Sequence, residues 1–333
     1  MKKILSLVLL VAVCVGSLCL VSCGEKNYRV GVGIYATTEA ASAEGDAAGS
    51  ASITATMAAI IVDEDGKIVS CELDATAEGG VAVSVSGVCS IEKAITTKGT
   101  LGDSYGMSAI GKTEWYKQAE AFASVAVGKT LDEVKALVAA DYKGTEDVVN
   151  AGCTIYVSDF ALAIEKAFAN AKTFSTKEKL TADSVSLGSA VSAISANADG
   201  ETDGKAEFNV VATSAVMSGT TVVAAITDEV SATLAVTSAG VVNGAGKVDS
   251  KRTLGDAYGM AAYGSYDANG DGKILEWYLQ VDAFDAACEG KDSDGIAALV
   301  VASGYPVDDV QTAGCTINAY NYAKSCVAAA KVD

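Results

Sequence analysis

The feature that most constrains this chain is an internal duplication. The segment Thr100-Leu-Gly-Asp-Ser-Tyr-Gly-Met107 recurs 153 residues later as Thr253-Leu-Gly-Asp-Ala-Tyr-Gly-Met260. Two further blocks recur 162 residues later: Glu114-Trp115-Tyr116 as Glu276-Trp277-Tyr278, and Ala151-Gly-Cys-Thr-Ile155 as Ala313-Gly-Cys-Thr-Ile317. Three blocks in the same order indicate two homologous domains, and the second has nine additional residues between Met260 and Glu276.

Each repeat shows strand patterns first and helical patterns afterwards. In the first repeat, residues 28–37, 51–62 and 67–73 are typical of strands, and Thr130-Leu-Asp-Glu133 is a capping box that begins a short helix. Phe160, Ile164 and Phe168 recur at helical spacing and predict a final helix over 158–171. We therefore expect an α+β fold of two homologous domains, each an antiparallel sheet followed by helices. The expected boundaries are 23–171 for the first domain, 172–185 for a linker and 186–333 for the second domain.

The N-terminus has the order of a secretory signal peptide, which we place at residues 1–22. Lys2 and Lys3 precede an apolar run over 4–20. The run ends in Leu20-Val-Ser-Cys23, which resembles the lipobox of bacterial lipoproteins, in which the cysteine is lipidated after cleavage. This resemblance implies a lipid anchor on Cys23 and a position on the extracytoplasmic face of the cell membrane. The alternative is an uncleaved membrane helix, for which the run is barely long enough.

The charge balance excludes several classes of function. The chain has 42 Asp and Glu, 24 Lys and Arg and no His, which gives a net charge of −18. Such an acidic protein is not expected to bind nucleic acid or an anionic lipid surface directly. Without histidine there is no histidine-based triad and no histidine zinc site.

One repeated turn suggests a cofactor. Ala-Gly-Cys-Thr precedes the last predicted helix in both repeats, with an Asp seven residues before the Thr. The arrangement resembles the FMN-binding domain family, in which a Ser-Gly-Ala-Thr turn precedes the terminal helix and its threonine can be esterified to the phosphate of FMN. The resemblance implies that FMN is bound by these turn residues: Gly152, Cys153, Thr154, Gly314, Cys315 and Thr316. Ala and Cys replace the Ser and Ala of the family, and the alternative is that Gly and Thr cap the helix while Cys packs in the core.

The two tryptophans occupy equivalent places in the repeats. Trp115 and Trp277 are each followed by a Tyr. Their rings could stack on an isoalloxazine ring, which makes them candidate cofactor residues. The alternative is that each tryptophan anchors a helix in the core.

The additional residues of the second repeat contain a possible calcium loop. Asp267, Asn269 and Asp271 stand at positions 1, 3 and 5, and Gly follows at position 6, as in the first half of an EF-hand loop. Position 12 holds Tyr278, so Glu276 at position 10 would have to supply the remaining carboxylate. The alternative is a solvated turn.

The cysteines differ between the repeats. Cys71 and Cys89 belong to the first repeat only, and Cys288 and Cys326 to the second only. Gain or loss in pairs suggests one disulfide in each domain, in a compartment that permits disulfides.

These features predict a membrane-anchored, extracytoplasmic FMN-binding protein that acts as an electron carrier rather than as an enzyme. Its expected partners are the membrane, a flavin transferase and a redox partner. The alternative is a non-catalytic surface binding or structural lipoprotein that has lost the cofactor and that calcium stabilises.

Overall fold

The computed structural model describes residues 24–77, 79–262 and 275–331. The predicted α+β class is confirmed, because antiparallel sheets combine with helices that follow them in each repeat. The first repeat contains β1 (Lys26–Ala41), β2 (Gly49–Val62), β3 (Ile68–Ala75), β4 (Gly80–Val83), β5 (Cys89–Lys93), α1 (Lys98–Leu101), η1 (Gly102–Tyr105), η2 (Met107–Ile110), α2 (Trp115–Ala126), α3 (Leu131–Lys135), α4 (Glu146–Asn150) and α5 (Ser158–Asn170).

The second repeat follows the same order of elements. It contains β6 (Lys172–Thr176), β7 (Val185–Ala196), β8 (Gly204–Ser218), β9 (Thr221–Val236), β10 (Val242–Asn243), β11 (Gly246–Val248), α6 (Lys251–Leu254), η3 (Gly255–Tyr258), η4 (Met260–Ala262), α7 (Trp277–Cys288), α8 (Ser293–Ala297), α9 (Asp308–Thr312) and α10 (Tyr320–Ala330). Strand β9 covers in one piece the stretch that the first repeat divides between β3 and β4.

The strands form two antiparallel sheets. In the first sheet the order is β11-β1-β2-β4-β5, while β3 also pairs with β2 and β6 with β1. In the second sheet the order is β10-β9-β8-β7. The two sheets pack face to face, with β1 against β9 and β3 against β7. Because β1 corresponds to β7 and β3 to part of β9, the repeats are related by an approximate two-fold arrangement.

The interface between the sheets is the largest apolar core. Alternate residues of β1, among them Val32 and Ile34, point into it and are fully buried. Phe208 and Val210 of β8 and Ile226 of β9 enter the same core from the other sheet. Each repeat therefore buries the inner face of its sheet against the other repeat.

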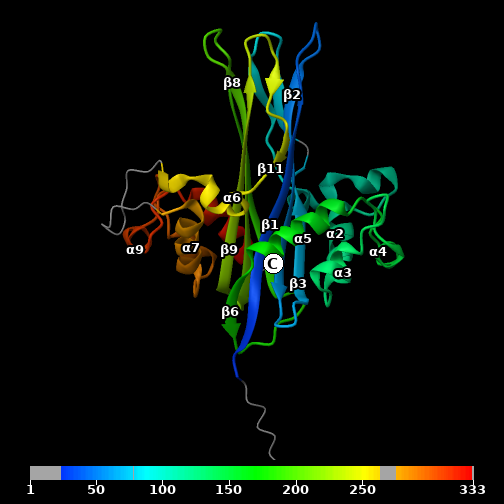
Figure 1. The fold of residues 1–333 in the computed structure, drawn as a ribbon, viewed down its shortest axis with the longest axis vertical. Helices are drawn as coiled ribbons and strands as arrows, with labels where there is room; N and C mark the ends of the chain where they lie inside the picture. Colours follow the sequence, from blue (N-terminus) through cyan, green and yellow to red (C-terminus); the bar gives the residue numbers. More distant parts are fainter. Residues whose placement is uncertain (1–23, 78, 263–274, 332–333) are drawn as a thin grey trace, which may run out of the picture.

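The outer faces of the sheets are covered by helices over only part of their length. Figure 1 shows helices α2, α3 and α4 on one side of the sandwich, helices α6, α7 and α9 on the other, and the long strands projecting beyond both groups. Helix α5 lies so close to β1 that a Cβ at Gly33 would be 2.1 Å from the Ala163 carbonyl oxygen. Only glycine permits this approach of helix and strand. The resulting packing is helix, sheet, sheet, helix.

The shared core changes the predicted domain organisation. The repeats begin and end near the expected residues, but they form one fused sandwich and not two bodies joined by a linker. The predicted linker 172–185 opens with β6, which pairs with β1 along Lys26–Val30. Strand β11 of the second repeat also pairs with β1 of the first. Backbone hydrogen bonds therefore join the repeats in addition to the core.

Several predicted elements agree with the structure. Strands β1 and β2 contain the first two predicted stretches, β3 begins one residue after the start of the third, and α5 matches the predicted final helix to within one residue. At the start of α3, the Thr130 side chain and the Glu133 carboxylate make the reciprocal capping-box hydrogen bonds. Of the helices that the structure describes, none is long and apolar enough to cross a membrane. The signal segment and Cys23 lie outside the described residues.

Candidate functional site

The Gly-Cys-Thr turn is held in the same way in both repeats. The backbone N–H and the hydroxyl of Thr154 both donate to Oε1 of Gln118 on α2, at 2.8 and 3.0 Å. In the second repeat, Thr316 makes the same two bonds to Gln280 on α7, at 3.0 and 2.9 Å. We call this arrangement the Gln–Thr clamp.

The orientation of each glutamine is fixed by its other end. The amide nitrogen of Gln118 donates to the Thr113 carbonyl at 2.8 Å, and that of Gln280 to the Leu275 carbonyl at 3.0 Å. Both glutamines are buried, so their amide groups need these partners. Because Nε2 of each glutamine donates to this backbone carbonyl, Oε1 at the other side of the amide faces the threonine.

The clamp determines how each threonine hydroxyl is presented. Because the hydroxyl proton points inward to the glutamine oxygen, the lone pairs of Oγ1 are directed away from it. Thr154 is exposed and Thr316 half-buried, so neither residue is enclosed in the core. A threonine oxygen in this state suits attachment of an electrophilic group.

The other turn residues have structural roles that fit their chemistry. Gly152 and Gly314 have φ of 111° and 120°, a backbone conformation that side chains other than glycine rarely adopt. Cys153 and Cys315 are fully buried in the cores under the helices. Burial raises the pKa of the Cys315 thiol to about 12 and also raises the pKa of Cys153, so both stay protonated. The predicted contact of these thiols with a cofactor is replaced by core packing.

The helices that follow the turns begin without a favourable cap. Helix α5 starts after Val157 and α10 after Ala319, and neither residue caps its helix with a side-chain hydrogen bond. Apolar residues are unfavourable at the N-cap position, because the first N–H groups of a helix need hydrogen-bond acceptors and an apolar side chain has none. In α10 one of these groups, the N–H of Tyr320, is satisfied by the Asn318 side chain.

Both tryptophans are core anchors and do not offer a face to a flavin. Trp115 is 5 % and Trp277 1 % exposed, and they pack edge-on against Phe160 and Tyr322. The Trp277 indole N–H donates to the Tyr322 hydroxyl at 2.8 Å. The expectation of ring stacking on Trp115 and Trp277 is therefore wrong, since a buried indole has no open face.

Exposed tyrosines, and not the tryptophans, lie near the Gly-Cys-Thr turns. Tyr142 and Tyr156 are 64 % and 67 % exposed in the first repeat, and the N–H of Val157 donates to the Tyr142 carbonyl at 2.9 Å. Tyr305 and Tyr320 are 48 % and 58 % exposed in the second. Tyr142 has φ of 66°, which costs free energy for a bulky residue. The Tyr142 and Tyr156 rings are both exposed, and the Lys143 ammonium lies over the Tyr156 ring at 5.9 Å.

Glu276 has a role that does not depend on calcium. Its carboxylate accepts from the N–H groups of Met260 and Ala261, at 2.9 and 3.2 Å. Glu114 accepts in the same way from Met107 and Ser108. Because the first repeat has no calcium motif, this contact serves the 3₁₀ turn in both repeats. Asp267, Asn269 and Asp271 lie outside the described residues.

The cysteines of the first repeat do not pair. Cys71 lies beside the core under the first-repeat helices, whereas Cys89 lies in the core between the sheets. They are on opposite faces of the first sheet, and both are free thiols. The expected disulfide between Cys71 and Cys89 is therefore wrong.

Cys288 and Cys326 do lie together. Both are fully buried in the core under the second-repeat helices, on α7 and α10, and their thiols hydrogen-bond to each other. They are free thiols in this structure, so the disulfide remains a prediction. We expect peptide mapping of protein exported to an oxidising compartment, without reduction, to find Cys288 linked to Cys326 and Cys71 and Cys89 alkylated. Alkylation of all four would contradict it.

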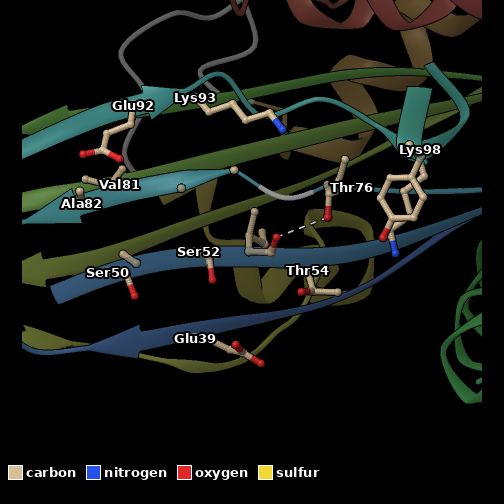
Figure 2. Close-up of a pocket in the computed structure, with 16 residues that line it drawn as sticks. Glu39, Ser50, Ser52, Thr54, Thr76, Val81, Ala82, Glu92, Lys93 and Lys98 are labelled. Carbon is tan, nitrogen blue, oxygen red and sulfur yellow. Dashed lines mark hydrogen bonds between the residues drawn. The ribbon is translucent and has the colours of Figure 1, made fainter. Parts of the chain in front are cut away.

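A separate hollow lies on the outer face of the first sheet, above α1. Its volume is about 650 Å³, and Figure 2 shows Ser50, Ser52 and Thr54 along β2, with Glu92 and Lys93 on β5 beyond the intervening strand β4. The hydroxyl of Thr76 in its wall donates to the Ile53 carbonyl at 3.3 Å. At the equivalent places of the second repeat, Lys205 and Glu207 form an ion pair at 2.7 Å. The polar side chains along this stretch of strand therefore differ between the repeats.

Comparisons of the chain with family models, with curated proteins and with solved structures find no match. Each repeat can therefore be compared with the other, and a feature that both share is the best candidate for a common function. Among the features described above, the Gln–Thr clamp is the polar arrangement with an open oxygen that both repeats share.

Gln118 and Gln280 were missed by sequence reasoning. Each follows its repeated tryptophan by three residues, so the repeated block extends further than Glu-Trp-Tyr. Extending the alignment of the repeats would have revealed them, although not their partner 36 residues away.

Proposed function

We propose that the protein is a lipid-anchored, extracytoplasmic flavoprotein that carries FMN on a threonine of each repeat and transfers electrons. The observation that supports this most is the Gln–Thr clamp, which presents Oγ1 of Thr154 and of Thr316 in the same way. The residues that would hold the phosphate are these threonines and the backbone that follows them. Bound flavin supplies one- and two-electron transfer.

The attachment step is a phosphoryl transfer that leaves the oxidation state of the flavin unchanged. A flavin transferase would use a flavin–nucleoside pyrophosphate as donor. The threonine Oγ1 attacks the flavin-side phosphorus, the pyrophosphate P–O bond breaks, and a nucleoside monophosphate leaves with the electron pair. The hydroxyl proton passes to a base of the transferase. Gln118 and Gln280 act as positioning residues, because an amide oxygen fixes the hydroxyl but does not take its proton.

The surroundings of Thr154 and Thr316 suit a phosphate. Helix α5 begins four residues after Thr154, and α10 begins four residues after Thr316. Helix N-termini favour anions, by typically 0.3–1 kcal/mol at an exposed site. The first turn of α10 has no acidic residue that would compete with the phosphate, whereas the first turn of α5 contains Asp159. The second repeat is therefore the more favourable of the two.

The ring of the flavin would use different residues from those expected. Since Trp115 and Trp277 are buried, the exposed tyrosines next to the turn are the aromatic side chains available for stacking. They are Tyr142 and Tyr156 in the first repeat and Tyr305 and Tyr320 in the second.

Substitution of the two threonines is expected to remove flavin one equivalent at a time. Protein co-expressed with a flavin transferase should carry about two flavins, Thr154→Val and Thr316→Val about one each, and the double variant none, because valine has the shape of threonine without the oxygen. Thr154→Ser should keep the flavin. The measurement is flavin absorbance per protein together with mass spectrometry of the two peptides.

The repeats serve as controls for each other. Gln118→Met should lower loading of Thr154 and leave loading of Thr316 unchanged, because only the first clamp is broken. Two results together would favour the alternative of a non-catalytic surface lipoprotein. The parent protein would take up no flavin, and the Thr154→Val/Thr316→Val variant would match it in every other property. The burial of both tryptophans is the observation that favours that alternative.

A further inference from the structure

An acidic crevice of about 460 Å³ lies at an edge of the sandwich, away from the Gln–Thr clamps. Its walls are β3, α1 and α2 of the first repeat, and β7 and α10 of the second. Three carboxylates line it: Glu72, Asp74 and Glu120. The β7 and α10 wall contributes Leu187, Gly188, Ser189 and Ala328, none of which is charged.

The carboxylates are held in place by the backbone. The N–H of Leu187 on β7 donates to Glu72 at 2.7 Å, and the N–H of Gly99 on α1 donates to Asp74 at 2.8 Å. Glu72 has an exposed surface toward the crevice, and the protein atoms around its carboxylate desolvate it. Desolvation, together with the charges of Asp74 and Glu120, raises the pKa of Glu72 to about 7, and burial also raises the pKa of Asp74.

The approximate two-fold arrangement gives this crevice a counterpart on the other side of the sandwich. The counterpart is formed by β9, α6 and α7 of the second repeat with β1 and α5 of the first. There Arg252 stands at the place of Gly99, and its guanidinium contacts Asp282 at 2.7 Å and Asp285 at 3.2 Å. Lys172 also pairs with Asp282. The carboxylates of the counterpart are therefore matched by cations from the chain itself.

The acidic crevice has a different set of acids from its counterpart and has no arginine at the equivalent place. Glu120 corresponds to Asp282, whereas Gly99 replaces Arg252. Glu72 and Asp74 stand where the second repeat has Ala225 and Thr227, while Ala123 and Ala75 stand where it has Asp285 and Asp228. Acids are therefore exchanged between positions and not added. In the counterpart, the equivalent place is filled by the Arg252 guanidinium, which lies between two carboxylates.

We propose that the acidic crevice binds a small organic cation whose guanidinium or primary ammonium group takes the place that the Arg252 side chain holds on the other side. The volume suits a small ligand. A guanidinium donates several N–H groups to planar carboxylates and is weakly hydrated, which favours it in a partly enclosed site. Across the described residues no group of His, Cys, Asp and Glu has the arrangement of a metal site, which favours an organic cation over a metal ion.

Titration calorimetry of the mature protein with agmatine at about pH 8 and constant ionic strength tests the site. Constant ionic strength matters because a net charge of −18 attracts any cation. We expect one agmatine per protein, and about tenfold weaker binding in Glu120→Gln, which removes a charge without changing shape. Glu146→Gln on the exposed surface of α4 removes the same charge and should bind like the parent protein. N-butylurea, which is neutral, should not bind.

A second variant fills the crevice from within. Gly99→Arg places a guanidinium beside Asp74, as Arg252 does beside its acids, and should abolish agmatine binding and raise the midpoint of thermal unfolding. Gly99→Ala is the matched control: its Cβ would lie 3.0 Å from the Asp74 carboxylate, which has to shift slightly, and this variant should still bind. Equal binding to parent, Glu120→Gln and Gly99→Arg would overturn the proposal, as would binding of calcium chloride but not of agmatine.

Affinity for agmatine should rise with pH. Protons compete with the cation for Glu72, so binding at about pH 6 should be up to about tenfold weaker than at about pH 8. The other titratable groups that face Glu72 are Asp74, Glu120, Cys71 and Tyr116, with Lys98 beside Asp74. The Cys71 thiol has a pKa of about 12 and keeps its proton throughout. Glu72→Gln should flatten the pH dependence, and an unchanged pH dependence would contradict this part of the proposal.

Discussion

Cutting the chain between the two repeats is expected to unfold both halves and not to release two stable domains. Each sheet buries its inner face only against the other sheet, so a separate half would expose residues such as Val32, Ile34, Phe208 and Ile226. Exposed apolar faces of this size are not tolerated in soluble monomers. The first half would also lose β11, which completes its sheet beside β1.

Circular dichroism and denaturant titration of residues 24–177, which keep β6 paired with β1, and of residues 178–333 measure the effect. We expect no cooperative transition from either half alone, and recovery of one transition when the two halves are co-expressed. The control is full-length protein that is first folded and then cut by a protease in the loop at 177–183. It has the same chain break as the separate halves, but its two sheets were already packed when the break was made. Two separate halves that each unfold cooperatively would contradict the fused sandwich.

Removal of Arg252 is the single substitution with the largest expected effect on stability. Its side chain is 5 % exposed and contacts Asp285, which is 4 % exposed. Breaking a buried ion pair from one side leaves the other charge uncompensated, which costs about 3–5 kcal/mol. We expect Arg252→Met to lower the free energy of unfolding by this amount. The Arg252→Met/Asp285→Leu variant should recover part of the loss, because neither charge then remains.

The loss should depend on pH in a defined direction. Burial raises the pKa of Asp285 above its ordinary value of 3.8, although Arg252 opposes the shift. The folded protein therefore holds this proton more tightly than the unfolded chain, and stability falls as pH rises above 3.8. Without Arg252 the pKa of Asp285 rises further, so the fall should continue to higher pH, and the deficit of Arg252→Met should shrink as pH approaches 3.8.

A surface ion pair provides the comparison for Arg252. Lys205 pairs with Glu207 at 2.7 Å, but the Lys205 side chain is 44 % exposed. Lys205→Met should change the free energy of unfolding by less than about 1 kcal/mol. Equal losses from Arg252→Met and Lys205→Met in urea titrations would show that burial does not control the first effect.

The sequence allowed the elements to be predicted better than their assembly. Period-two alternation located β1, and helical spacing located α5, because local patterns determine both. The packing of the two sheets was not predicted, since no local pattern tells which face of a sheet meets another repeat. One signal was present: β2 ends in the continuous apolar run Met57–Val62, which is typical of a strand buried on both faces.

The candidate site was predicted only in part. The repeated motif identified Thr154 and Thr316, but their glutamine partners lie 36 residues away, and that contact depends on how α2 and α7 pack. Repetition of Trp115 and Trp277 reflects two equivalent cores and not a shared ligand. The exposed tyrosines were missed because they do not align between the repeats: Tyr142 corresponds to Gly304, and Tyr156 to Asn318.

The mass of the intact mature protein after co-expression with a flavin transferase tests the proposed function most directly. We predict an increase equal to two FMN esters, located by fragmentation on Thr154 and Thr316, in protein that is yellow after denaturation. A mass that corresponds to the lipidated but otherwise unmodified chain, in protein that is colourless and takes up no added FMN, would contradict it.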